Sequence, residues 1–344
     1  MYGDMQCCDA DHDLALTIED EEGPTIDVET DDPSDPMGLH RAVTTFRRGC
    51  EATLNVHSGL VDAGPVYGTD EEYVQSTLRE PDTCRMRVAD GDFLPLTTNA
   101  DGEGRFFFIA GDVRVSEHAF LASQHTVWVR EHNRICEAVN QDPAFADMSE
   151  DGKFDLVRNV IIAKFQQVVL TEFLPALGIT QSDLEGADRL INGPDVSVEF
   201  SIAYRLGHDL IANSVGTIDI ADAFNAENFF LDKTGPPNAP SVTYKSNANT
   251  LLSNIMLQLS TTSANEIDGK LSDALRNFLF GRDMGEDLAG RNIFRGRELG
   301  VPTYAGVAEC FGLDADATVR AQHCFSIYSA YAMTEFTQLH YSVI

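Results

Sequence analysis

The spacing of apolar residues predicts a mainly helical protein. Apolar positions recur at helical intervals over residues 117–141, 151–178 and 198–214. Pro175 and Gly178 predict where the second of these helices ends. Strand signals are few, and Gly, Pro and Asp interrupt the chain from about residue 50 to 110. We therefore expect the mainly α class: one large helical domain with loop-rich segments and little β.

The first of these helices carries an unusual set of polar side chains. In AGDVRVSEHAFLASQHTVWVREHNRI, apolar residues lie on several sides, which is typical of a buried helix. The same stretch holds Arg114, Glu117, His118, His125, Arg130, Glu131, His132 and Arg134. Buried ionic groups are costly unless they are paired or bind something charged. The pattern therefore indicates either a ligand site or a buried polar network.

Composition narrows the class of partner. The 344 residues hold 43% hydrophobic residues, enough for a sizeable core, and a net charge of -31 argues against nucleic acid and anionic membranes. No apolar run reaches 18 residues, which predicts no membrane span, and the start MYGDMQCCDADHD does not read as a signal peptide. Residues 18–40 are rich in Asp, Glu and Pro and predict an acidic, exposed loop.

The cysteines leave the redox compartment open. Seven are scattered along the chain without CxxC pairs: Cys7, Cys8, Cys50, Cys84, Cys136, Cys310 and Cys324. Three disulfides with one thiol, or seven thiols, both fit this count.

Two histidines are candidates for chemistry, although each alone also fits a structural role. His12 lies between acidic residues in DADHD, which is typical of a solvated turn. His208 follows Gly207 in the apolar segment YRLGHDL, as a satisfied core histidine would. Their meaning depends on the rest of the chain.

Five ordered segments together resemble the animal-type haem peroxidase family, which includes myeloperoxidase, peroxidasin and the cyclooxygenases. They are NVHSGLVDAGPVYGTDEE, GDVRVSEHAFLASQHTVWVREHNRI, FQQVVLTEFLPALG, AYRLGHDL and DLAGRNIFRGRELGVPTY. The resemblance runs from about residue 3 to 313. It implies one haem peroxidase domain over 1–344 that is truncated at its N-terminus, diverges after about 313, and is secreted or extracellular.

The resemblance assigns the central roles. His208 would be the proximal iron ligand, with the side-chain oxygen of Asn292 as acceptor for its other ring nitrogen. His12 would be the distal acid and base, and Arg114 would stabilise the charge that develops as the O–O bond breaks. These roles imply a peroxidase that reduces hydrogen peroxide and oxidises small organic donors or halides.

The resemblance also implies how haem is held, as haem b or as a covalently modified haem. Asp11 and Glu117 match carboxylates that form esters with haem methyl groups, while His118 replaces a methionine that makes a third link in myeloperoxidase. Arg205 and Arg295 match basic residues that pair with the haem propionates.

A calcium site is implied as well. Asp13, Ser58, the Leu60 carbonyl and Asp62 match its oxygen ligands, but Gly64 stands where the family often has a serine. On spacing alone, the same loop is an ordinary tight turn.

Departures from the family keep other functions open. Cys8 stands where the family usually has a distal glutamine, and the chain is short, so a truncated or degenerate haem-binding protein without turnover is an alternative. A fatty-acid dioxygenase would need a tyrosine at position 205, where this chain has arginine and Tyr204 lies one residue away. A haem-binding or adhesion module is the non-enzymatic alternative.

Overall fold

The computed structural model describes residues 44–47, 50–53, 58–97, 106–180, 205–224, 226–235, 241–282, 285–298 and 301. The chain divides into two compact units, residues 1–52 and 53–344. At the end of the first, β1 (Thr44–Arg47) pairs with β2 (Cys50–Thr53), whose last residue already belongs to the second unit. The second unit carries the described helices and the predicted site residues from Ser58 onward, and the rest of the description concerns it.

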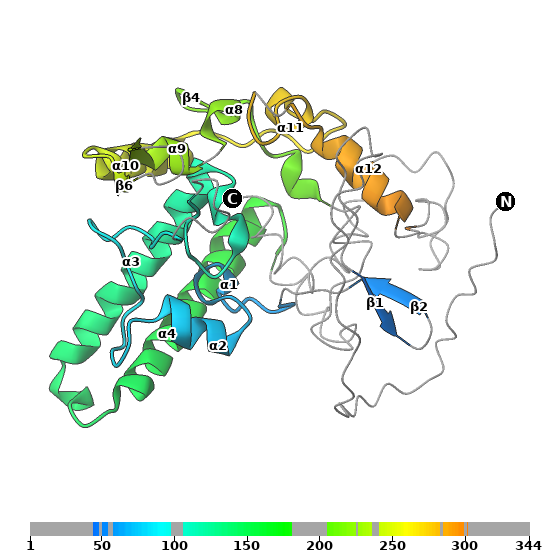
Figure 1. Cartoon of the computed structure of the whole chain (residues 1–344). Helices are drawn as coiled ribbons and strands as arrows, with labels where there is room; N and C mark the ends of the chain where they lie inside the picture. Colours follow the sequence, from blue (N-terminus) through cyan, green and yellow to red (C-terminus); the bar gives the residue numbers. More distant parts are fainter. Residues whose placement is uncertain are drawn as a thin grey trace, which may run out of the picture. The chain divides into compact units, whose positions relative to one another are not determined.

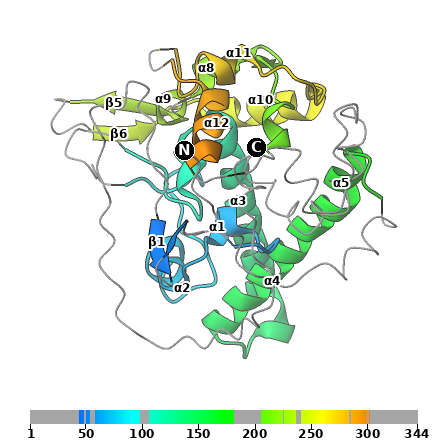
Figure 2. The ribbon, with the colours of Figure 1, turned by 90° about the vertical axis from the view of Figure 1, so that its right-hand side faces the viewer.

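The second unit contains two long helices that lie side by side (Figures 1 and 2). The helix α3 (Ala119–Gln141) runs beside α4 (Glu150–Val168), and the 3-10 turn η3 (Pro143–Phe145) connects them. The helix α4 buries Phe154, Val157, Ile161 and Phe165. Their spacing of three or four residues places them on one face, so burial of this apolar stripe holds α4 in the core.

The predicted end of the second helical segment is confirmed. After α4 the chain continues through the π turn η4 (Val169–Phe173) and α5 (Leu174–Ala176). Gly178 then takes a φ of 82°, in the left-handed region where glycine has no steric penalty. The helical run therefore stops where the sequence predicts.

Shorter elements make up the rest of the described part of this unit. Residues 58–97 form α1 (Gly64–Tyr67), α2 (Glu71–Tyr73) and the π turn η1 (Val74–Leu78), which agrees with the predicted loop-rich region. Beyond residue 205 the helices are α8 (Ile220–Ala223), α9 (Ala226–Phe230), α10 (Ala248–Thr261), α11 (Asp273–Arg276) and α12 (Leu288–Glu298). Both α9 and α10 pack against α3.

Strand structure is minor in the described ranges, as predicted. The strands β3 (Ser214–Val215) and β4 (Ile218–Asp219) form one antiparallel pair, and β5 (Leu231–Thr234) and β6 (Ser241–Tyr244) form another. The architecture of this unit is thus mainly α.

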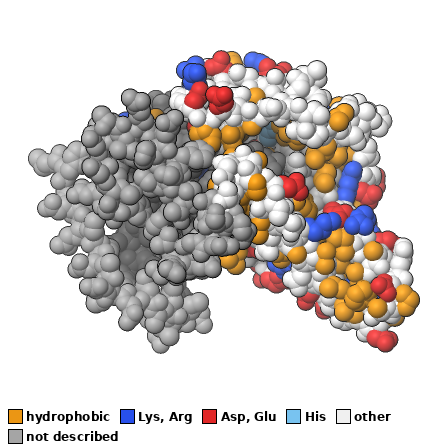
Figure 3. Space-filling view, turned by 180° about the vertical axis from the view of Figure 1, so that it is seen from behind, with side chains coloured by type: hydrophobic (Ala, Val, Ile, Leu, Met, Phe, Trp, Pro, Cys, Tyr) orange, Lys and Arg blue, Asp and Glu red, His pale blue; other side chains and the backbone are white. Residues whose placement is uncertain are grey.

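Figure 3 shows one face of the molecule, where hydrophobic surface lies around a hollow in which histidine surface is visible.

Two predicted helix bounds are wrong. Glu117 lies before α3 rather than in its first turn, because His118 takes an extended backbone conformation and caps the helix. Over the described part of 198–214, only the 3-10 turn η6 (Leu206–His208) forms, and the chain enters β3 at Ser214. Gly207 lowers helix propensity inside this segment.

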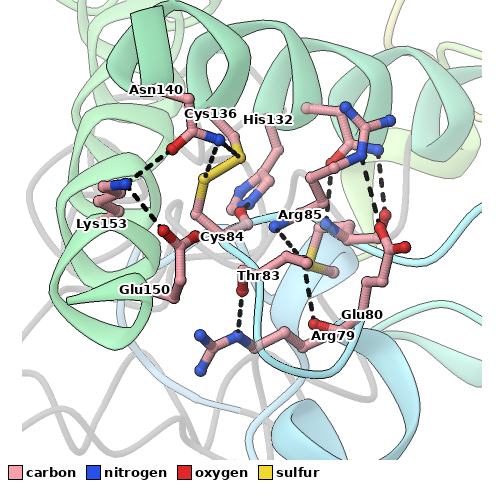
Figure 4. The surroundings of a disulfide bond; sticks show 12 residues. Arg79, Glu80, Thr83, Cys84, Arg85, His132, Cys136, Asn140, Glu150 and Lys153 are labelled. Carbon is pink, nitrogen blue, oxygen red and sulfur yellow. Dashed lines mark hydrogen bonds and ion pairs between the residues drawn. A yellow bond between two sulfur atoms is a disulfide. The ribbon is translucent and has the colours of Figure 1, made fainter. Parts of the chain in front are cut away.

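A disulfide ties the irregular region to α3 (Figure 4). Cys84 and Cys136 are bonded, with 52 residues of sequence separation and 5.7 Å between their Cα atoms. Beside it, Lys153 of α4 donates to Asn140 of α3 at 3.0 Å and pairs with Glu150 at 2.7 Å. The closed loop would lower the conformational entropy of the unfolded chain, worth about 4 kcal/mol of stability.

The polar side chains in the middle of α3 are structural. Arg130 donates to the carbonyls of Asp92 and Gly91, at 2.8 and 2.9 Å, and to Asn249 of α10 at 2.8 Å. Glu131 accepts hydrogen bonds from both Arg134 and Lys164. These contacts confirm that the predicted polar network docks the helix inside the fold.

His132 extends that network into the core. Its Nε2 lies 2.8 Å from the Cys84 carbonyl, which can only accept, so Nε2 carries the proton. The Nδ1 atom then accepts from the Tyr67 hydroxyl at 2.7 Å. Burial lowers the pKa of His132 to about 4, which keeps the ring neutral in this arrangement.

Candidate functional site

Arg114 is fixed by its own segment. The 3-10 turn η2 (Val113–Ser116) is capped by Asp112, whose carboxylate accepts from the Arg114 backbone N–H at 2.9 Å. The same carboxylate accepts from Arg114 Nε at 2.9 Å and from Nη2 at 2.5 Å. Burial alone would raise the pKa of Asp112, but the hydrogen bonds and charge of Arg114 outweigh it and lower that pKa.

Glu117 lies one turn beyond, among positive charges. Its side chain keeps an exposed surface, yet the protein around it desolvates the carboxyl enough to raise its pKa. Arg114, Arg205 and Arg291 oppose this increase, while Asp112 adds to it. Arginines from three separate segments of the chain are therefore close enough to act on this carboxyl.

His118, which stands where myeloperoxidase has a methionine, has a structural role. Its Nδ1 accepts from the Phe120 N–H at 3.2 Å, which caps α3, and its Nε2 lies 3.2 Å from the Ile220 carbonyl. Burial lowers the pKa of His118 to about 4. The ring therefore joins the start of α3 to α8, a role that the sequence did not predict because histidine is not a usual helix cap.

His208 is buried at the end of η6. Burial, helped by the charge of Arg205, lowers its pKa to about 4, so the imidazole is neutral. Its Nδ1 lies 3.5 Å from Nδ2 of Asn292 in α12. In the described part of the chain, no hydrogen bond joins its Nε2 to another residue.

The amide of Asn292 bears on the predicted acceptor role. An amide nitrogen cannot accept from an imidazole N–H, whereas the side-chain oxygen can. Turning the amide by 180° exchanges the two atoms at the same position. The structure thus brings His208 and Asn292 together, and the oxygen-facing orientation stays a prediction.

Arginines gather beside this pair. Burial is the main reason that the pKa of Arg205 is lowered, and the charges of Arg114 and Arg295 lower it further. Glu117 opposes them. Arg291 of α12 forms an ion pair with Glu286. Residues that are far apart in sequence, Arg114 with Glu117, Arg205 with His208, and Asn292 with Arg295, therefore converge on one site.

The donor set of this site fits a haem. A neutral, buried imidazole whose Nδ1 faces Asn292 leaves Nε2 as the ring nitrogen for an axial iron ligand. Arginine guanidinium groups are suited to pair with propionate carboxylates, and Arg205 and Arg295 are close enough to repel each other.

The predicted calcium ligands are only partly described. The Ser58 hydroxyl accepts from the Leu60 N–H at 3.1 Å, and Asp62 accepts from the Gly64 N–H at 3.2 Å. These contacts form local turns, and the described residues hold no group of three or more His, Cys, Asp or Glu able to bind a metal ion. Asp13 lies outside the described residues. Calcium binding stays a prediction.

Several other predicted features also lie outside the described residues. This applies to Cys8, Asp11 and His12, to the acidic loop 18–40, and to the divergent end after about residue 313.

Where the structure describes the chain, none of its helices has the length and apolar character needed to cross a membrane.

Comparison with known proteins identifies the family. The chain is 29% identical over 279 residues to chorion peroxidase of Drosophila melanogaster, covering 74% of this chain and 33% of that protein. It is 28% identical over 295 residues to peroxinectin A of Dictyostelium discoideum, covering 81% of this chain and 53% of that protein. The chain therefore spans about a third to a half of the length of these relatives.

A solved structure shows the same fold. Peroxidase A from Dictyostelium discoideum aligns with a TM-score of 0.56 and 24% identity, over 83% of this chain and 57% of that chain. The sequence model of the animal haem peroxidase family matches residues 2–340, nearly the whole sequence. The chain belongs to the animal haem peroxidase family.

Proposed function

We propose that this chain is a haem peroxidase that reduces hydrogen peroxide and oxidises small organic donors, with halides as a second class of donor. The observation that carries the proposal is the convergence of Arg114, Glu117, Arg205, His208 and Asn292 on one site. Membership of the animal haem peroxidase family supports it.

On the proximal side, His208 would hold the haem iron through Nε2. Asn292 would accept from the other ring nitrogen and so fix the orientation of the imidazole. Arg205 and Arg295 would pair with the propionates. Ester links to the haem methyl groups would come from Glu117 and Asp11. Because its pKa is raised, Glu117 is protonated more readily than an ordinary glutamate. When bound, haem supplies the redox chemistry that peroxide reduction requires.

On the distal side, His12 would take a proton from one oxygen of hydrogen peroxide and return it to the other as the O–O bond breaks. Arg114 would stabilise the negative charge that develops on the departing oxygen. Arginine suits this role because it keeps its charge at any working pH.

We also propose that the protein is secreted and that calcium binds at Asp13, Ser58, Leu60 and Asp62. The disulfide between Cys84 and Cys136 supports secretion, because such bonds persist in oxidising compartments. The Ser58 hydroxyl and the Asp62 carboxylate lie in one loop and are oxygen donors of the kind that calcium prefers.

The proposal is tested by replacing the proximal histidine. His208→Ala should abolish the Soret band of haem-loaded protein and its turnover of peroxide with a small phenolic donor. The matched control is His132→Gln, which changes another buried histidine away from the site and should keep both. Normal haem binding and turnover by His208→Ala would refute the assignment.

A further inference from the structure

Asp112 makes more contacts with Arg114 than capping requires. A capping carboxylate needs only the hydrogen bond from the backbone N–H, at 2.9 Å here. Asp112 additionally accepts from Nε and Nη2, which fixes one edge of the planar guanidinium at two points. The Asp112 side chain is 4% exposed and that of Arg114 is 31% exposed, so a buried anchor holds a cation that reaches outward.

His125 lies next to this pair and is neutral. Its Nδ1 donates to the Leu121 carbonyl at 2.7 Å, which leaves Nε2 as a buried acceptor that has no hydrogen-bond partner among the described residues. Burial lowers the pKa of His125, Asp112 opposes this decrease and Arg114 adds to it. A neutral ring does not compete with Arg114 for the carboxylate, so the full charge of Asp112 acts on the guanidinium.

We propose that Asp112 is a positioning residue that orients Arg114 for the peroxide reaction. This inference rests on the proposed function of Arg114. A free arginine side chain samples many rotamers, and ordering it during the reaction would cost conformational free energy. Asp112 removes that cost in advance, since the guanidinium plane is already fixed by two hydrogen bonds.

The experiment is a double-mutant cycle on the haem-loaded full chain. Asp112→Asn and Asp112→Ser both keep a capping oxygen but remove the charge, and each is made with Arg114 intact and with Arg114→Gln. Two quantities are measured: the dissociation constant of fluoride from the visible spectrum, and the rate of reaction with hydrogen peroxide. The control is Asp142→Asn, because Asp142 caps η3 through the same kind of contact, to the Ala144 N–H at 2.9 Å.

With Arg114 intact, both Asp112 variants should bind fluoride roughly 10-fold more weakly and react with peroxide roughly 100-fold more slowly. With Arg114→Gln they should cause no further loss, and Asp142→Asn should match the wild type. Two Asp112 variants are made in case one of them does not fold, and a single folded variant is enough for the comparison.

Equal losses in both backgrounds would show a structural effect and overturn the inference. Unchanged or tighter fluoride binding would also overturn it, because removing a negative charge then helps the anion more than lost orientation harms it. If the fluoride pattern holds while the wild type does not react with peroxide, the proposed function fails and the positioning role stands.

Discussion

Acid should destabilise the fold through two buried histidines, His132 and His118. His132 accepts from Tyr67 through Nδ1, so a second proton on the ring would remove that acceptor. His118 caps α3 through Nδ1 in the same unprotonated form. Burial lowers the pKa of each ring from 6.5 to about 4. The unfolded chain therefore binds protons that the folded chain does not.

This difference in proton binding sets the direction and the size of the change in stability with pH. The stabilising contribution of each neutral ring is fully present above pH 6.5 and is lost as the pH falls from 6.5 towards 4. Between pH 7 and pH 5, each histidine should lower the free energy of unfolding by about 2 kcal/mol. Together the two amount to about 4 kcal/mol, a large fraction of the stability of a typical domain.

Urea unfolding at pH 7 and pH 5 measures this effect with the disulfide intact. His132→Gln keeps one donor and one acceptor but does not titrate, so its stability should fall by about 2 kcal/mol less than that of the wild type. His118→Gln should behave in the same way. Val157→Ala, which removes fully buried methyl groups, should destabilise equally at both pH values. If His132→Gln and the wild type lose the same stability between the two pH values, the reasoning is wrong.

Three further predictions test other parts of the account. Asn292→Asp should lower the reduction potential of the haem iron, because a charged acceptor makes the His208 imidazole more anionic; an unchanged potential would count against their pairing. Replacing Cys84 and Cys136 by serine should cost about 4 kcal/mol in urea unfolding, and a loss below about 1 kcal/mol would contradict the closed-loop argument. Gly111→Ala should reduce both stability and peroxide turnover, because its Cβ would lie 2.2 Å from a backbone carbonyl oxygen beside the Arg114 segment. Gly269→Ala, whose Cβ meets nothing within 4 Å, is the control that should change neither.

Helix positions were largely predictable from the sequence, whereas some ends were not. The body of α3 and the whole of α4 follow from apolar spacing, and Gly178 marks the end of the second run. The start of α3 depends on His118 acting as a cap, which requires the Ile220 carbonyl from a segment 102 residues away. Local spacing carries no information on such a contact.

The candidate site shows the same division. The residue types at Arg114, His208 and Asn292 are readable in the sequence, but their convergence is a property of the fold. The contact of Asp112 with the Arg114 side chain could not be predicted, because an acidic residue before a helix is usually only a cap. The pairing of Cys84 with Cys136 was equally inaccessible, since seven scattered cysteines allow many connectivities.

Rapid mixing of haem-loaded protein with hydrogen peroxide tests the central claim most directly. The wild type should show a fast change in its visible spectrum. His12→Ala should bind haem normally and react about 10²- to 10⁴-fold more slowly, and Arg114→Ala about 10²- to 10³-fold more slowly. Because both residues act on the same bond cleavage, the double variant should lose less than the product of the single losses. A wild type that binds haem without reacting, or single variants within about threefold of it, would contradict the assignment of a peroxidase site to these residues.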